Sequence, residues 1–317
     1  SGKTALPWRA IIVAKRDSEL AQADMVYRLA SPSRIESTEW ISPGKVAWEW
    51  WNYWGITGVD FEAGVNTATY KAYIDFAAEY GIEHVILDEG WAVKYKNNLM
   101  EVVPEIDLQQ IVDYATQKGV GIILWAGYNA FNADIEGVCR HYAAMGVKGF
   151  KIDFMDRDDQ PMMEFYYRTA QICAEHKLLV DFHGCAKPAG MNRTYPNVIN
   201  FEAVFGLEQM KWSKTTVDHM AYDVTMPFIR MVAGPIDYTQ GAMRNATKKN
   251  YRPVNREPMS QGTRCHQLAA YAVFYSPLSM LCDSPSAYRK EKECAEFIAS
   301  IPTVWDQTAV LDGKIGE

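Results

Sequence analysis

The chain has 317 residues, of which 48% are apolar and 22% charged, a balance typical of a globular protein large enough for one barrel-sized domain. Its net charge of −7 gives it no electrostatic reason to bind nucleic acid or an anionic membrane. The sequence contains no apolar run of the roughly eighteen residues that a membrane-spanning helix requires.

From residue 45 onward the expected elements alternate between strands and helices. Short buried strands are expected over 45–51, 84–87, 121–126, 149–154, 178–183 and 198–201. Apolar residues at helical spacing predict helices over 67–80, 107–118, 135–145 and 161–176. The pattern weakens after residue 201, where 231–237 and 277–282 are the candidates for the last two strands.

This regular alternation predicts a parallel sheet covered by helices, and eight units predict an α/β fold of the (β/α)8 or TIM-barrel type. A doubly wound open sheet is the alternative, but the sequence has no glycine-rich phosphate loop to support it. We expect the barrel over residues 41–302. A strand over 8–14 and a helix over 18–29 precede it without a partner strand, so residues 1–40, like the tail 303–317, are expected to connect to other domains.

Barrel enzymes place their chemistry where the strands end. Carboxylates and aromatic residues follow most of the expected strands here, which favours a glycosidase, because glycoside hydrolysis needs one ionised and one protonated carboxyl group beside the scissile bond. For any single carboxylate, an exposed ion pair or a helix cap is the commoner explanation, and the 13% aromatic content alone favours core packing over sugar stacking. The residues at these strand ends include Trp51, Asp88, Glu89, Trp91, Asp153, Asp181, His183, Glu202, Glu208 and Asp237.

The sharpest local feature is Lys151-Ile152-Asp153. Strand alternation places Lys151 and Asp153 on one side of the sheet, where the cation would keep the carboxylate ionised and could reach a sugar hydroxyl. A buried structural ion pair is the alternative. The acidic run 156–159 lacks the spacing of a calcium loop and is interpreted as a solvated loop with a helix cap.

Several motifs together resemble glycoside hydrolase family 97, in the family's order and over nearly the whole chain. They are Asp88-Glu89-Gly90-Trp91, Lys151-Ile152-Asp153-Phe154, His183-Gly184-Cys185-Ala186-Lys187-Pro188 and Asn200-Phe201-Glu202-Ala203 through Glu208, with further likeness over 222–228 and 233–239. The resemblance implies a catalytic barrel between an N-terminal β-sandwich, of which residues 1–40 would be the remnant or linker, and a C-terminal β-domain reached through 303–317. It also implies that these domains pack on the barrel and that the protein is periplasmic or secreted.

The family contains inverting α-glucosidases and retaining α-galactosidases, and the two branches differ at positions that this chain shows. Retaining members carry an aspartate nucleophile at the end of the fourth strand, and inverting members have glycine at that position. This chain has Asp153 there. Inverting members carry a glutamate base after the fifth-strand histidine, where this chain has Gly184, and a second base near the third strand, where only Asn129 and its neighbours stand. The resemblance therefore implies a retaining α-galactosidase of α-galactoside oligosaccharides, with a covalent glycosyl-Asp153 intermediate and Glu208 as general acid/base.

The resemblance also implies bound Ca2+ with Glu202 and Glu208 as ligands, and sugar contacts by Glu89, Lys151 and His183. Their places at the same rim add Trp51, Trp91 and Asp237 as candidate substrate-binding residues. Retention predicts that the carboxyl groups of Asp153 and Glu208 lie about 5–5.5 Å apart. The alternatives are an inverting α-glucosidase, a non-catalytic carbohydrate-binding barrel, and a barrel enzyme of phosphorylated metabolites, which would need a glycine-rich phosphate site.

Overall fold

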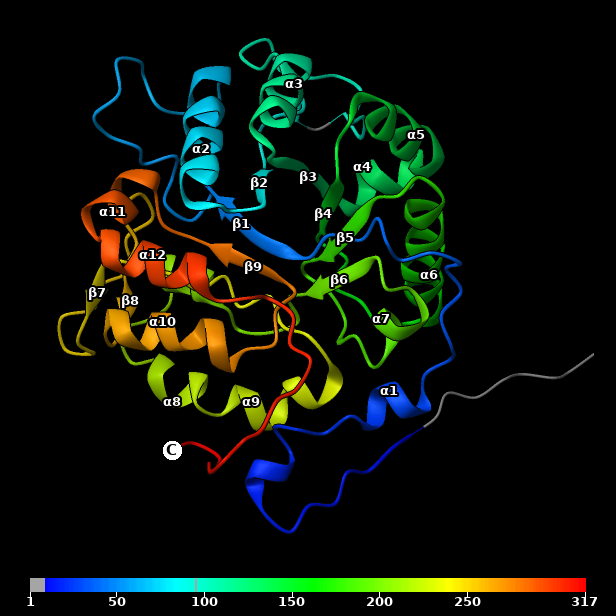
Figure 1. Ribbon diagram of the computed structural model, residues 1–317, viewed down its shortest axis with the longest axis vertical. Coiled ribbons are helices and arrows are strands. Elements are labelled where there is room, and N and C mark those ends of the chain that lie inside the picture. Colours follow the sequence, from blue (N-terminus) through cyan, green and yellow to red (C-terminus); the bar gives the residue numbers. More distant parts are fainter. Residues whose placement is uncertain (1–8, 95) are drawn as a thin grey trace, which may run out of the picture.

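The computed structural model describes residues 9–94 and 96–317, and its seven-stranded parallel sheet curls into a nearly closed barrel (Figure 1). The strands follow the order β6-β5-β4-β3-β2-β1-β9 around the barrel, so the first strand pairs with both the second and the last. The strands are β1 (Gly44–Trp48), β2 (His84–Leu87), β3 (Gly121–Gly127), β4 (Gly149–Asp153), β5 (Leu179–Phe182), β6 (Val198–Phe201) and β9 (Leu278–Leu281).

A segment over residues 236–240, which bends at Thr239 with a φ of 62°, closes the barrel between β6 and β9. The Asp237 N–H donates to the Phe201 carbonyl at 2.8 Å, and the Cys282 N–H donates to the Gln240 carbonyl at 3.2 Å. This segment takes the remaining place of the predicted (β/α)8 barrel. The predicted strand over 231–237 is wrong in its bounds, because 231–233 form a short 3-10 helix and Pro235 has no N–H for a ladder.

Helices surround the barrel (Figure 1), and the four predicted helices form within a residue or two of their expected bounds. Helix ends follow the expected chemistry: Asn66 and Asp107 accept N-terminal N–H groups, and Gly81 and Gly119 end their helices with φ of 69° and 74°. The helices are α1 (Met25–Leu29), α2 (Thr67–Tyr80), α3 (Leu108–Lys118), α4 (Tyr128–Ala133), α5 (Ile135–Met145), α6 (Gln160–Glu175), α7 (Met191–Thr194), α8 (His219–Asp223), α9 (Met226–Ile229), α10 (Arg264–Val273), α11 (Pro285–Lys290) and α12 (Lys292–Ser300), with 3-10 helices η1 (Asp17–Glu19), η2 (Leu207–Lys211) and η3 (Met231–Ala233). A separate pair, β7 (Asn245–Ala246) and β8 (Ser260–Gln261), completes the strands.

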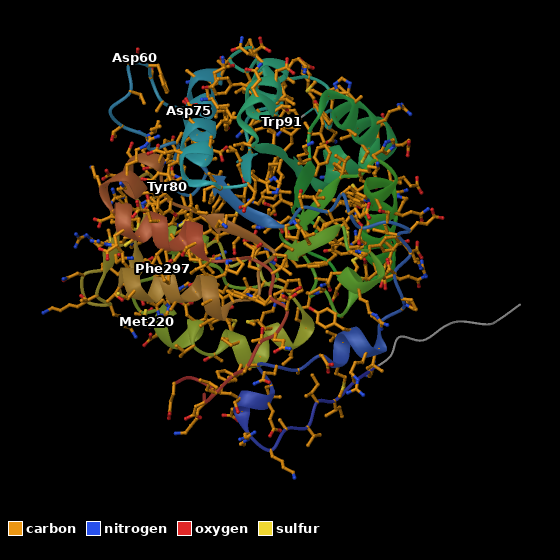
Figure 2. All side chains as sticks on the ribbon, in the orientation of Figure 1. Asp60, Asp75, Tyr80, Trp91, Met220 and Phe297 are labelled. Atoms are coloured by element: carbon orange, nitrogen blue, oxygen red, sulfur yellow. The ribbon has the colours of Figure 1, made fainter. Side chains whose placement is uncertain are left out.

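Alternation along the strands divides the core into two layers of side chains. Figure 2 draws the side chains of the described residues on the ribbon. Val46, Ile86 and Ile123 belong to a cluster that includes buried residues of several strands and of the 236–240 segment. Their neighbours Val85 and Ile122 belong to a second cluster with the helices. No helix in the described part of the chain is long and apolar enough to cross a membrane.

The segment before the barrel differs from the prediction. Trp8 lies outside the described residues, and residues 9–14 form no strand, because no neighbouring strand pairs with them; Ile11 and Val13 are 83% and 88% exposed. The predicted helix over 18–29 is also wrong, because only the short η1 and α1 form there. Residues 303–317 contain no helix or strand and run beside this segment, where the Gln22 side chain donates to the Val310 carbonyl at 3.2 Å.

Candidate active site

Side chains from the carboxyl ends of successive strands surround a cavity of about 340 Å³. Asp153 at the end of β4 and Glu208 on η2 both line it, so the two predicted catalytic carboxylates share one cavity. Their separation of about 5–5.5 Å stays a prediction. Other residues that line the cavity include Trp48, Trp50, Asp88, Glu89, Trp125, Lys151, Phe154, Gly184, Glu202 and Trp212.

Two N–H groups hold the carboxylate of Asp153. The Trp125 indole donates to Oδ2 at 3.2 Å, and the Phe154 backbone N–H donates to Oδ1 at 2.7 Å. Gly184 leaves the space that this carboxylate occupies: a Cβ there would lie 3.0 Å from Asp153 Oδ1 and 2.9 Å from the Phe154 nitrogen. Asp153 in this position is therefore incompatible with an unstrained side chain at 184.

Glu208 has a different environment from Asp153. Its backbone N–H donates to Thr239 Oγ1 at 3.3 Å, and its carboxyl group lies near that of Glu202. Burial, followed by the negative charge of Glu202, raises the pKa of Glu208 to about 8. A carboxyl group with this pKa carries a proton at neutral pH, which is the state that a general acid requires.

Lys151 is buried in the floor of the cavity, and its ion pair is with Asp88 rather than with Asp153. Its ammonium donates to Asp88 Oδ2 at 2.8 Å and lies 4.4 Å from the Trp48 ring centroid. The Trp48 indole donates to the same Asp88 oxygen at 2.6 Å. Burial opposes the charge of Lys151, but the surrounding carboxylates, Asp88 first, outweigh it and raise the pKa of the side chain. Lys151 thus carries a positive charge next to both candidate catalytic groups.

His183 and Asp237 lie beneath the cavity and are almost completely buried. The two side chains form a hydrogen bond of 2.6 Å between His183 Nε2 and Asp237 Oδ2. Burial and the charge of Lys151 lower the pKa of His183, but the surrounding carboxylates, Glu202 first, outweigh them and raise it well above its usual value. Glu202 Oε2 also accepts the Gly184 N–H at 2.7 Å. His183 and Asp237 thus support the floor of the cavity, and the contact with sugar that the sequence suggested for each of them stays a prediction.

Among the described residues, two groups of side chains have the geometry to hold a metal ion. Ligand atoms of His183, Glu202 and Glu208 lie within 4.8 Å of one another, as do those of Asp181, His183 and Asp237. The first group contains both predicted calcium ligands and borders the cavity.

The tryptophans that line the cavity differ from those expected from the sequence. Trp51 and Trp91 are 1% and 0% exposed and donate to the carbonyls of Leu207 and Trp125, at 3.4 Å and 2.8 Å. They support the wall from behind, and a direct contact with sugar stays a prediction. Sequence reasoning missed Trp125 and Trp212; strand alternation could have indicated Trp125, which stands two residues before Gly127 at the end of β3.

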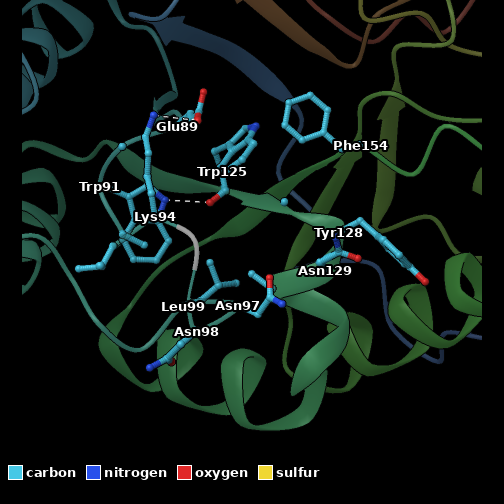
Figure 3. Close-up of a pocket in the computed structure, with 15 residues that line it drawn as sticks. Glu89, Trp91, Lys94, Asn97, Asn98, Leu99, Trp125, Tyr128, Asn129 and Phe154 are labelled. Carbon is cyan, nitrogen blue, oxygen red and sulfur yellow. Dashed lines mark hydrogen bonds and ion pairs between the residues drawn. The ribbon is translucent and has the colours of Figure 1, made fainter.

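A second pocket, of about 350 Å³, lies beside the first and shares Glu89, Trp125 and Phe154 with it (Figure 3). Glu89 forms an ion pair of 3.0 Å with Lys94 there. The Trp91 indole, drawn with its bond to the Trp125 carbonyl, reaches Trp125 from this side. Trp125 is therefore a wall between two pockets as well as a hydrogen-bond donor to Asp153.

Three comparisons place the chain among known proteins. Residues 50–204 match the family described as glycoside hydrolase 97. The chain is 65% identical, over 98% of its length, to the retaining alpha-galactosidase of Bacteroides thetaiotaomicron, and 31% identical, over all of its length, to a probable retaining alpha-galactosidase of Streptomyces bingchenggensis. The chain spans 47% of each of these two proteins, about half their length. A family 97 glycoside hydrolase of Pseudoalteromonas sp. strain K8, solved with panose, superimposes with a TM-score of 0.84 at 26% identity, covering 96% of this chain and 50% of that one.

Proposed function

The chain belongs to glycoside hydrolase family 97, and from this premise we propose that it is the catalytic barrel of a retaining α-galactosidase that acts on α-galactoside oligosaccharides. One observation carries the proposal: Asp153 and a Glu208 with a raised pKa line one cavity, with Gly184 beside Asp153. Inversion would need a base that holds a water on the far side of the sugar, and glycine at 184 has no group to hold it.

In the first step, Asp153 attacks the anomeric carbon as Glu208 gives its proton to the leaving glycosidic oxygen. The carbon–oxygen bond to the leaving sugar breaks, and a β-glycosyl ester to Asp153 forms. In the second step, the ionised Glu208 takes a proton from water, whose oxygen attacks the same carbon and releases Asp153. Two inversions give net retention of the α-configuration.

The floor of the cavity supplies groups for the sugar. Lys151 and Glu89 line it and can donate to or accept from hydroxyl groups, and the ring of Trp48 gives an apolar surface beside Lys151. His183 and Asp237 hold the floor from below and are proposed to act on the sugar, directly or through Lys151 and Glu202. Trp51 and Trp91 are proposed to fix the positions of the neighbouring wall residues.

We propose that Ca2+ binds at Glu202 and Glu208. Their carboxylate oxygens are the ligands that calcium prefers, whereas the imidazole of His183 suits it less well. When bound, the ion would orient the two carboxylates and bind sugar hydroxyls. Its charge would also lower the pKa of Glu208, in opposition to burial.

The domain organisation follows from the same family. We propose that residues 1–40 belong to or lead from an N-terminal β-sandwich, and that residues 303–317 lead to a C-terminal β-domain. We propose that both domains pack on the barrel of residues 41–302. A periplasmic or secreted location is proposed with them.

An assay of aryl α-galactosides against aryl α-glucosides, with NMR detection of the first-formed anomer, tests the function. The expected product is galactose, formed first as its α-anomer. A β-anomer formed first would refute retention. Asp153→Ala should abolish turnover, and added azide should restore it and give the β-galactosyl azide. Asp158→Ala, an exposed carboxylate in the following loop, is the control and should keep normal turnover.

A further inference from the structure

We propose that Trp212 is a stacking platform for the sugar that leaves in the first step, a proposal that rests on the proposed glycosidase function. Trp212 directly follows η2, the segment that carries Glu208, and it lines the same cavity. It is 49% exposed, although tryptophan usually buries most of its large apolar surface. An exposed indole at this place offers a flat apolar surface next to the leaving oxygen.

Three contacts hold Trp212, and two of them involve its ring. Its backbone N–H donates to the Gln209 carbonyl at 3.2 Å, and its indole N–H donates to Gln209 Oε1 at 2.9 Å. The ring also meets the Trp50 ring edge to face, with centroids 6.1 Å apart and planes at 80°. Because its polar atom is satisfied and its orientation is set, the ring can bind a sugar with little loss of conformational entropy.

Trp50 is itself held from two sides. It stacks on Trp48 at 5.7 Å, with an angle of 16° between the planes. The ammonium of Lys211 lies 4.2 Å from the centroid of the Trp50 ring and donates to the carbonyls of Trp50 and Trp51, each at 2.9 Å. Trp212 therefore rests on a rigid stack that continues into the barrel floor, where Lys151 lies on Trp48.

The chemistry of displacement places the leaving sugar on this side of the cavity. A nucleophile attacks opposite the leaving group, and the general acid must reach the leaving oxygen. Phe154 is the other exposed aromatic residue among the described ones that line the cavity; it directly follows Asp153 and borders the second pocket with Trp125 (Figure 3). The residues that line this second pocket do not include Glu208 or Trp212. Of the two exposed aromatic residues among those that line the cavity, Phe154 thus follows the nucleophile in sequence, whereas Trp212 follows the segment that carries the acid.

The test compares a substrate that has a leaving sugar with one that has none. In Trp212→Ala, kcat/KM for the disaccharide melibiose should fall about tenfold, as expected when one aromatic contact is lost. For α-galactosyl fluoride it should stay within about twofold of the unchanged enzyme. Trp212→Phe should recover part of the loss on melibiose. Trp305→Ala removes another partly exposed tryptophan, outside the barrel, and should change neither value.

Equal losses on both substrates, or none on melibiose, would overturn the role of Trp212. If the unchanged chain does not hydrolyse α-galactosyl fluoride, the proposed function fails instead. The role of Trp212 is then tested by measuring sugar binding. In an Asp153→Asn background, calorimetry should show melibiose binding more tightly than galactose, and Trp212→Ala should remove that preference. A preference that survives Trp212→Ala would contradict the proposal independently of turnover.

Discussion

Replacing Gly184 with alanine tests whether the position of Asp153 depends on the empty space beside it. The new Cβ would lie 2.9 Å from the Phe154 nitrogen and 3.0 Å from Oδ1 of both Asp153 and Asp156. Gly184 also has a φ of +49°, in the left-handed region that residues with a Cβ rarely adopt. The substitution therefore brings backbone strain together with a close contact to the proposed nucleophile.

The two effects have different expected sizes and different readouts. Holding alanine in the left-handed region costs about 1–2 kcal/mol, which should appear as lower stability to urea. The Phe154 nitrogen is backbone and yields little, so relief of the contact must come largely from movement at Asp153. A misplacement of about 1 Å at a reacting atom can cost about a hundredfold in rate, and a shift of a few tenths of an ångström should lower kcat about tenfold or more.

Gly119→Ala is the matched control for this experiment. Gly119 ends α3 with a φ of +74°, and a Cβ there would have nothing within 4 Å. This variant should lose stability to a similar extent but hydrolyse an aryl α-galactoside with unchanged kcat. If Gly184→Ala also kept its kcat while losing stability, the space at 184 would be irrelevant to Asp153 and our reasoning would be wrong.

Three further predictions concern single groups in or next to the site, among them the buried Glu49, whose Oε1 accepts the Asp88 N–H at 2.7 Å. Trp125→Phe keeps an aromatic ring but removes the indole N–H that donates to Asp153 Oδ2, so kcat for aryl α-galactosides should fall about tenfold with little change in stability; an unchanged kcat would contradict a positioning role. Burial, and next the charge of Asp88, raises the pKa of Glu49 to about 8. In the folded state Glu49 therefore keeps a proton that the unfolded chain loses near pH 4.5. The contribution of this protonated group to the free energy of unfolding is lost as pH rises through about 8. Urea unfolding should therefore show Glu49→Gln gaining stability relative to the unchanged protein at pH 9 but not at pH 4. The same difference in the free energy of unfolding at both pH values would refute this. Removal of Ca2+ with a chelator should move the alkaline limb of the pH profile of kcat toward pH 8, because burial and Glu202 raise the pKa of Glu208 to about 8. Added Ca2+ should move this limb to lower pH, since the ion lowers that pKa. An alkaline limb that does not change with Ca2+ would argue against an ion at Glu208.

The strand ends could be predicted from the sequence because local patterns determine them. Short β-branched runs and glycine after helices locate β2, β4 and β6 to within a residue or so, and the barrel rule then places Asp153 and Glu208 at one rim. The closing segment 236–240 has no such pattern. Its place between β6 and β9 is set by hydrogen bonds to Phe201 and Cys282, and these neighbours are distant in the sequence.

The site shows the same limit at individual side chains. Alternation indicated that Lys151 and Asp153 share a side of β4, but the ion pair of Lys151 is with Asp88 on the far side of β3. Similarly, the strand-end position of Trp51 made it a candidate for sugar contact, whereas its neighbour Trp50 lines the cavity. Sequence spacing gives the rim but not the direction in which each rim residue points, because packing across strands decides that.

The pairing of Lys151 with Asp88 explains how two carboxyl groups in one cavity can take opposite roles. Lys151 lowers the pKa of Glu208, so a free ammonium so close would strip the acid of its proton. The carboxylate of Asp88 neutralises much of that charge at 2.8 Å. Glu202 adds negative charge near Glu208, while N–H donors hold both oxygens of Asp153. The roles therefore follow from the neighbours of each carboxyl group, and Asp88, which need not touch the scissile bond, is the residue that lets a lysine and a protonated glutamate share one floor.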